Sequence, residues 1–322
     1  MLLQSYPELR TRNRDVIAEG LRSSGYGTRI ELPSGGSPDQ FTVRKADFED
    51  IGLSFVRYDF PITIAVNPRD DILIGFQIRK VSEVAIDGEV MQNTVSDAGC
   101  LVPEQRPWTV HSPAGYEVLI LRVAGESLRR KTSALMGADR GRLDLRPPSA
   151  AAADRVLRDV TLNFARELDA VDPIFLPALV AHSTEDICVR ILRSLSEQVL
   201  EAERAPAAPS AVQLGQLEQY LVANYARPLT VENLAAVSGV SACSVFRHFR
   251  ARYDCTPHQY LEKIRLEMAY AGLMSCRDLS SVGAIALSCG FHSRRSFEQA
   301  FLKRFGERPT AMLVERPRRR RR

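Results

Sequence analysis

Two kinds of hydrophobic pattern divide the chain, the first with the period of β-strands and the second with the period of helices. Between residues 30 and about 124, short apolar runs alternate with turn signals. In residues 72–79 (ILIGFQIR) an isoleucine or phenylalanine occupies every second position, which indicates a half-buried strand. Asp87-Gly88 separates two further runs and indicates a hairpin, because glycine tolerates a positive φ. Many short strands with frequent turns predict an N-terminal β jelly-roll (cupin-like) domain.

From Ser127 onward the apolar spacing becomes helical. Residues 150–168 and 184–203 contain no glycine or proline and carry apolar side chains at helical intervals, so flanking helices are expected within 127–203. The stripe through Ile187 and Ile191 is typical of core packing, with a dimer seam as the alternative. Residues 204–210 (RAPAAPS) contain two prolines and small residues, which predicts an interdomain linker centred on 206–210.

The C-terminal third contains a degenerate internal repeat. LAAVSGVSACSVFRHFRARYDCTP (234–257) is similar to IALSCGFHSRRSFEQAFLKRFGERP (285–309), and the matched apolar residues recur four positions apart. Each copy has a glycine suited to end one helix and a serine suited to cap the next, at Gly239 and Ser241 and at Gly290 and Ser293. We therefore predict an all-α domain with two helix-turn-helix units, joined by a helix over 257–275. The second helix of each unit is expected to lie in a DNA major groove.

Charge distribution supports the same division. The 322 residues are enough for about two domains. Residues 211–322 hold 18 Lys and Arg against 9 Asp and Glu, whereas the remainder holds 25 against 30. A basic C-terminal third indicates a nucleic-acid partner, with a solvated basic face as the alternative. No run of eighteen apolar residues and no secretory signal pattern is present, so no membrane partner and a cytoplasmic location are expected.

Residues suited to metal binding or catalysis are scattered. The six cysteines form no Cys-x-x-Cys pair, and His111 is the only histidine in the predicted strand region, where a metal-dependent jelly-roll needs several. No nucleophilic triad or phosphate-binding glycine loop appears. We expect no catalytic residue, no metal site and no cofactor. A metal-independent jelly-roll enzyme, or a binding module fused to a DNA-binding domain, is the alternative.

Residues 211–314 resemble the DNA-binding domain of the AraC/XylS transcription regulators. The resemblance rests on RPLTVENLAAVSGVS, TPHQYLEKIRLEMA, IALSCGFHSRRSFEQAF and FLKRFGERPT, and GTRIELPSGGSP is similar to the start of a XylS-like effector domain. It implies an effector-sensing and dimerisation domain over 1–205, a DNA-binding domain over 211–316 and a basic tail over 317–322. The implied function is a sequence-specific activator that senses a small aromatic or organic acid. The implied partners are operator DNA, RNA polymerase, the small-molecule effector and a second copy of the chain.

The repeat and the resemblance together select the residues expected to face DNA. If the matched apolar positions point inward, the first recognition helix presents Ala242, Cys243, Phe246, Arg247 and Arg250, and the second presents Arg294, Arg295, Glu298, Gln299 and Lys303. The resemblance places the base contacts on Cys243, Phe246 and Arg247 and on Arg294, Arg295 and Gln299. Arginine can hydrogen-bond to guanine and glutamine to adenine, so the second helix is expected to make more of the base-specific contacts. Contacts to phosphates are expected at Thr230, Lys263 and Arg265.

The effector-binding residues cannot be assigned from the sequence. An arginine can bind a carboxylate and a tryptophan can stack on a ring. Among the side chains of these types, Arg57, Arg79, Trp108 and Arg122 lie in or beside predicted strands.

Overall fold

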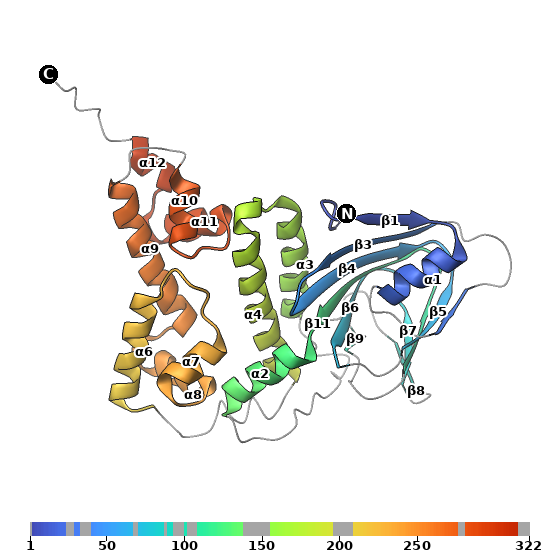
Figure 1. Cartoon of the computed structure of the whole chain (residues 1–322), viewed down its shortest axis with the longest axis horizontal. Coiled ribbons are helices and arrows are strands. Elements are labelled where there is room, and N and C mark those ends of the chain that lie inside the picture. Colours follow the sequence, from blue (N-terminus) through green and yellow to red (C-terminus); the bar gives the residue numbers. More distant parts are fainter. Residues whose placement is uncertain are drawn as a thin grey trace. The chain divides into compact units, whose positions relative to one another are not determined.

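A computed structural model describes residues 2–23, 29–32, 40–66, 70–86, 89–92, 100–101, 108–137, 155–195, 209–275 and 281–314 (Figure 1). The chain divides into two compact units. The first comprises Met1–Thr132, Gly141–Ala170 and Asp186–Gln198, and the second comprises Ser133–Arg140, Val171–Glu185 and Val199–Arg322. No helix among the described residues is long and apolar enough to cross a membrane.

The first unit is built on two antiparallel sheets. The six-stranded sheet has the order β1 (Glu8–Thr11), β3 (Phe41–Asp47), β4 (Ile51–Tyr58), β11 (Tyr116–Val123), β6 (Ile72–Arg79) and β9 (Cys100–Leu101). The five-stranded sheet has the order β2 (Arg29–Glu31), β5 (Ile62–Val66), β10 (Trp108–Ser112), β7 (Glu83–Ile86) and β8 (Glu89–Gln92). The predicted cupin-like fold is confirmed. The six-stranded sheet also contains a strand that the pattern did not indicate. This strand, β1, lies well before residue 30 and pairs with β3.

The predicted hairpin is present. β7 pairs with β8 in antiparallel register, with Ile86 opposite Glu89. The connecting dipeptide Asp87-Gly88 lies outside the described residues.

Four helices accompany the sheets along the chain: α1 (Arg14–Ser23), α2 (Gly125–Met136), α3 (Arg155–Ala170) and α4 (Leu176–Leu195). The sequence placed the start of the fourth near residue 184, yet it begins at Leu176. A short 3-10 turn, Pro173–Phe175, precedes α4, and the Asp172 side chain accepts a hydrogen bond from the Ile174 N–H at its start. Ile187 and Ile191 are fully buried within the chain itself, so this stripe serves core packing.

Strand β6 is buried on both faces, although its alternating pattern indicated burial on one. The row through Phe76 is buried as expected, but Gln77 on the opposite row is only 3% exposed. Gln77 faces the space between the two sheets, which holds a shared core. On the other side α3 lies beside β6, where Arg158 donates to the backbone carbonyl of Gln77 (3.4 Å). The packing of α3 and the second sheet, neither visible in a local pattern, leaves residues 72–77 of β6 with no solvent face.

The second unit contains a run of short helices. These are α6 (Ala211–Ala223), α7 (Val231–Ser238), α8 (Ala242–Tyr253), α9 (Pro257–Ser275), α10 (Ser281–Ser288), α11 (Arg294–Phe305) and α12 (Pro309–Val314). The predicted connecting helix over 257–275 is confirmed as α9. Val171–Glu185, which includes the first half of α4, belongs to the same compact unit.

Candidate functional sites: paired helix-turn-helix units and an enclosed cavity

Both predicted helix-turn-helix turns are present. α7 ends at Gly239 with a φ of 67°, and the Ser241 hydroxyl accepts a hydrogen bond from the Ser244 N–H (3.3 Å) at the start of α8. In the second copy Gly290 has a φ of 82°, and Ser293 accepts from the Ser296 N–H (3.1 Å) at the start of α11. Glycine and serine are the residues that suit these two positions, because glycine accepts left-handed geometry and serine caps a helix.

The apolar faces of the two second helices are matched as the repeat predicts. Val245 and Phe249 of α8 and Phe297 and Phe301 of α11 are all fully buried. Each pair is four residues apart and fixes one face of its helix toward the core. The opposite faces are therefore the ones available to DNA.

The first recognition helix departs from the expected reading face. Cys243 and Ala242 are 0% exposed, which corrects the expectation that they point outward. The physical reason is that the whole first turn of α8, Ala242–Val245, is packed into the core. Phe246 is half-buried, and its ring stacks on His258 with centroids 6.1 Å apart.

Two arginines remain on this side of α8. Arg247 is half-buried and donates to the Ser244 hydroxyl (3.4 Å), whereas Arg250 is exposed.

The second recognition helix exposes most of the residues expected of it. Arg295, Gln299 and Lys303 are exposed, and none of them has a hydrogen bond or ion pair with another described residue. Arg294 is also exposed but forms an ion pair with Glu298 (2.7 Å), one helical turn away. Among the described residues, α11 therefore presents these three side chains to solvent without a partner, and two of them are cationic.

The three residues expected at phosphates have different surroundings. Lys263 is exposed. Thr230 caps α7, and its hydroxyl accepts from the Asn233 N–H (3.2 Å). Arg265 is largely buried, and its guanidinium donates to the backbone carbonyls of Tyr225 and Arg227 (2.7 Å each). Burial lowers the pKa of Arg265 to about 10. Arg265 thus joins α9 to the segment after α6 through two of its guanidinium nitrogens, and its contact with a phosphate stays a prediction.

The first half of α4 contacts both helix-turn-helix units. Glu185 is 6% exposed, and its carboxylate accepts a hydrogen bond from the Val231 N–H (2.8 Å) at the N-terminus of α7. His182 stacks on His292 in the turn before α11, with ring centroids 4.2 Å apart. Burial, with smaller effects of the neighbouring His182 and Arg265, lowers the pKa of His292 to about 3. The sequence indicated neither contact, because the partners are more than forty residues apart.

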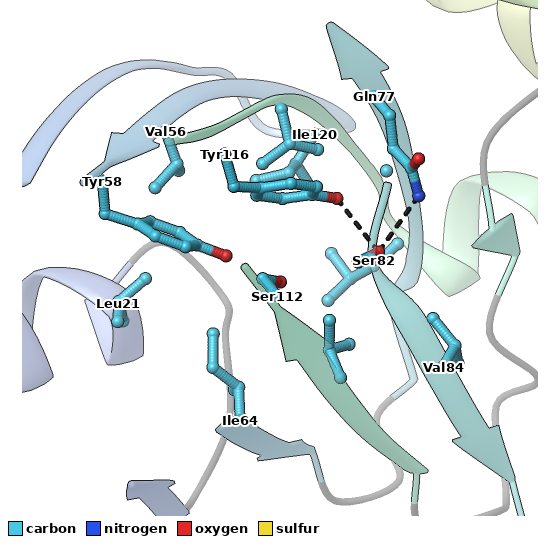
Figure 2. Close-up of a pocket in the computed structure, with 14 residues that line it drawn as sticks. Leu21, Val56, Tyr58, Ile64, Gln77, Ser82, Val84, Ser112, Tyr116 and Ile120 are labelled. Carbon is cyan, nitrogen blue, oxygen red and sulfur yellow. Dashed lines mark hydrogen bonds between the residues drawn. The ribbon is translucent and has the colours of Figure 1, made fainter. Parts of the chain in front are cut away.

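A cavity of about 40 Å³ lies between the two sheets of the first unit (Figure 2). Its walls are mainly aliphatic, and five polar but uncharged residues also line it: Tyr58, Gln77, Ser82, Ser112 and Tyr116. Strand alternation brings them inward, and Tyr58 lies directly opposite Tyr116 in the pairing of β4 with β11. The hydrophobic pattern of the sequence did not indicate this site. The available signal was a small or polar residue at alternate positions of strands that are otherwise apolar.

The polar side chains gather at one end of the cavity. Ser82 accepts hydrogen bonds from Gln77 Nε2 (3.0 Å) and from the Tyr116 hydroxyl (3.2 Å), as Figure 2 shows. Gln77 Oε1 is buried and has no hydrogen-bond partner among the described residues. Burial, followed by the neighbouring Tyr116, raises the pKa of Tyr58 well above its usual value, so its phenol stays neutral.

The arginines considered as effector ligands lie elsewhere in the first unit. Arg57 is within ion-pair distance of Asp59 (3.6 Å), and Arg122 pairs with Asp47 (2.9 Å). Arg79 is mostly exposed. None of them lines the cavity. The Trp108 side chain lies outside the described residues.

His111 has a structural partner. Its Nδ1 is 3.0 Å from the Thr63 hydroxyl on the neighbouring strand. No three His, Cys, Asp or Glu side chains gather as metal ligands within the described part of the chain.

Two family models match the chain. A model described as an AraC-binding-like domain matches residues 26–193, and one described as a helix-turn-helix domain matches residues 234–314. The first covers slightly more than half of the chain. Together they span both the cavity and the paired helix-turn-helix units.

Several curated transcriptional regulators are similar to part of the chain. The activator RclR of Escherichia coli (strain K12) is 35% identical over 96 residues, which are 30% of this chain and 33% of RclR. The probable regulator LumQ of Photobacterium leiognathi is 30% identical over 94 residues, 29% of this chain and 37% of LumQ. The chain thus spans about a third of the length of these two. XylDLEGF operon transcriptional activator 2 of Pseudomonas putida is 26% identical over 133 residues, 41% of this chain and 83% of that protein.

A solved structure is also similar to part of the chain. A probable AraC family transcriptional regulator from Rhodopseudomonas palustris is 33% identical, with a TM-score of 0.30. That match covers 32% of this chain and 95% of that one.

Proposed function

The chain belongs to the AraC family of transcriptional regulators, and from this premise we propose that it is an effector-responsive, sequence-specific transcriptional activator. The family is one of regulators and not of enzymes, so the enzymatic alternative is set aside. The observation that carries the proposal is the pair of capped helix-turn-helix units, in which α11 exposes Arg295, Gln299 and Lys303. Arginine and glutamine recognise guanine and adenine in the major groove, and Lys303 adds a charge that attracts phosphates.

Selection from a pool of randomised duplexes tests the DNA-binding function. The full chain is expected to enrich one motif, and the enriched duplex should bind at least about 10³-fold more tightly than a scrambled one at physiological salt. Enrichment of no motif would contradict sequence-specific binding.

Activation through RNA polymerase is the second part of the proposal. Relatives named as activators, among them RclR and the XylDLEGF operon activator, support it. Transcription in vitro from a promoter that carries the selected motif is expected to rise when the protein is added to RNA polymerase. A fall in transcript would identify a repressor instead.

We place the effector site in the cavity between the two sheets of the first unit. The cavity is mostly apolar with a few polar groups, which is the composition of small-molecule sites, and aliphatic walls suit an aromatic or other small organic ligand. A volume of about 40 Å³ holds roughly three water molecules, so a ring-sized ligand requires the wall to move. Leu21 of α1 is the lining side chain whose displacement enlarges the cavity without breaking a strand pair.

A further inference from the structure

We propose that the effector cavity selects an uncharged molecule, largely apolar, whose hydroxyl or N–H group donates a hydrogen bond to Gln77 Oε1. The inference rests on the proposed function, because it concerns the ligand of the same cavity. It also revises the expectation of an organic acid, because it excludes a carboxylate from this site.

The first argument is the absence of a cation. The described residues that line the cavity include no Lys, Arg or His. A buried carboxylate is costly unless it is paired with a cation and fully hydrogen-bonded. The arginines of the surrounding strands do not supply the pair, because Arg57 and Arg122 lie outside the cavity beside carboxylates of their own. An acid that entered the cavity would therefore give up its hydration without a compensating charge.

The second argument is the orphaned acceptor. The Gln77 amide is held by its Nε2 group, which donates to Ser82, and this leaves Oε1 buried without a donor among the described residues. A buried acceptor without a partner is unfavourable, whereas a ligand that donates to it removes the penalty. The Ser112 hydroxyl also lines the cavity and is likewise buried without a hydrogen-bond partner among the described residues. A hydroxyl ligand can donate to Gln77 Oε1 and accept from Ser112, so it suits the cavity better than a group that only accepts.

The third feature is the pair of phenols in the cavity wall. Tyr58 and Tyr116 face one another with ring centroids 5.5 Å apart, and burial holds the Tyr58 phenol in its protonated form. The cavity thus offers two aromatic rings, aliphatic walls and neutral hydrogen-bonding groups. A neutral, ring-sized molecule with one polar donor matches each of these features.

Four probes of nearly equal size separate the ligand classes. Benzyl alcohol carries a neutral donor, benzaldehyde a neutral acceptor, benzoate an anion, and toluene no polar group. Binding to the full chain is measured by calorimetry at pH 7 and by the shift in melting temperature. Benzyl alcohol is expected to bind at least about tenfold more tightly than benzoate, a difference of about 1.4 kcal/mol. Benzaldehyde and toluene should bind more weakly than the alcohol.

Two substitutions locate the binding in the cavity. Gln77→Met keeps the side-chain length, removes the acceptor and is expected to weaken benzyl alcohol about tenfold, to the level of toluene. Gly75→Ala adds a methyl group that faces the cavity and meets only Val118 Cγ2, at 3.5 Å, so it fills space without a clash. It should weaken alcohol and toluene alike. Thr63 does not line the cavity, so Thr63→Val is the control. It should change the affinity for neither benzyl alcohol nor toluene.

Each outcome bears on a separate part of the argument. Benzoate that binds as tightly as benzyl alcohol, with binding weakened by Gly75→Ala, overturns the neutral-ligand inference but leaves the effector cavity in place. Binding of none of the probes, or binding that neither cavity substitution changes, overturns the inference together with the placement of the effector site. Failure of the DNA-binding function is registered independently by the duplex selection.

Discussion

Among single residues, the two turn glycines Gly239 and Gly290 have similar backbones but different surroundings. Both have a positive φ, so any side chain is strained there. A Cβ at Gly290 would lie 2.7 Å from the carbonyl oxygen of Ala226, whereas at Gly239 the nearest atom is Gln213 Nε2, at 3.4 Å. We predict that Gly239→Ala lowers the free energy of unfolding by about 1–2 kcal/mol. Gly290→Ala should cost more. Urea unfolding of the full chain measures both, and equal losses would show that the Ala226 carbonyl moves freely.

The adjacent arginines Arg294 and Arg295 offer a matched test of base reading. Arg295 has no partner among the described residues, whereas Arg294 is paired with Glu298. Arg295→Ala is expected to cost about 1–3 kcal/mol on the selected duplex and much less on a scrambled one. Arg294→Ala should cost less, because its charge is already partly neutralised. Titrations on both duplexes at two salt concentrations measure these losses. If Arg295→Ala weakens both duplexes equally, the residue contacts phosphate and not a base.

Between elements, the stack of His182 on His292 predicts a dependence of stability on pH. The folded chain holds His292 neutral with a pKa of about 3, whereas an unfolded histidine takes up a proton near pH 6.5. Below pH 6.5 the unfolded state therefore binds more protons, and stability falls as the pH is lowered toward 3. The slope from this residue is up to about 1.4 kcal/mol per pH unit. Urea unfolding at pH 7 and pH 5.5 should show a smaller loss in His292→Gln than in the unchanged chain. An identical loss in both would assign the effect to other groups.

The contact of α4 with α7 predicts competition with DNA. The Glu185 carboxylate accepts the Val231 N–H at a helix N-terminus, which is where a DNA phosphate is expected to bind through Thr230 and Val231. Glu185→Ala frees this N–H and removes a negative charge, so affinity for both selected and scrambled duplexes should rise several-fold, the size of one phosphate contact. Asp186→Ala, the neighbouring carboxylate that pairs with Arg190, is the control. A circular dichroism melt confirms that each variant is folded. Unchanged DNA affinity in folded Glu185→Ala would show that this N–H does not meet phosphate.

The sequence predicts an element correctly where its signal is local. Prediction fails where residues distant in the sequence decide whether a side chain is buried or exposed. The glycine and serine of each turn lie within three positions of one another, so both helix-turn-helix units were predictable. Arg265 has the pattern of a surface cation. Its hydrogen-bond partners lie 38 and 40 positions away, so they could not be predicted from the local sequence. The helical spacing predicts that Cys243 and Arg247 lie on the same solvent-exposed face. The first turn of α8 is instead packed into the core. The cavity was missed for the same reason, because β4, β6 and β11 meet there only in three dimensions.

For the whole molecule, we predict that two copies of the chain associate through an exposed apolar face of the first unit. The stripe through Ile187 and Ile191 is buried in the core and is not such a face, whereas α3 exposes an apolar side chain. Val156 is 51% exposed there, and the half-buried Val160 lies one turn further along the same face. An apolar pair on an outer helix face suits a second copy of the same helix.

We therefore predict that the full chain sediments as a dimer and that Val156→Asp shifts it to the monomer. Val212→Asp is the matched control, because Val212 is 71% exposed on α6 in the DNA-binding part and should leave the dimer intact. Two linked DNA-binding parts hold each other at a high effective concentration over a direct repeat, so the dimer gains avidity that a single half-site does not give. Val156→Asp is thus expected to lower affinity for a direct repeat about 10²-fold or more while affinity for one half-site stays unchanged. A chain that remains dimeric after Val156→Asp has its interface elsewhere, and a monomeric unchanged chain that still prefers direct repeats must dimerise on the DNA itself.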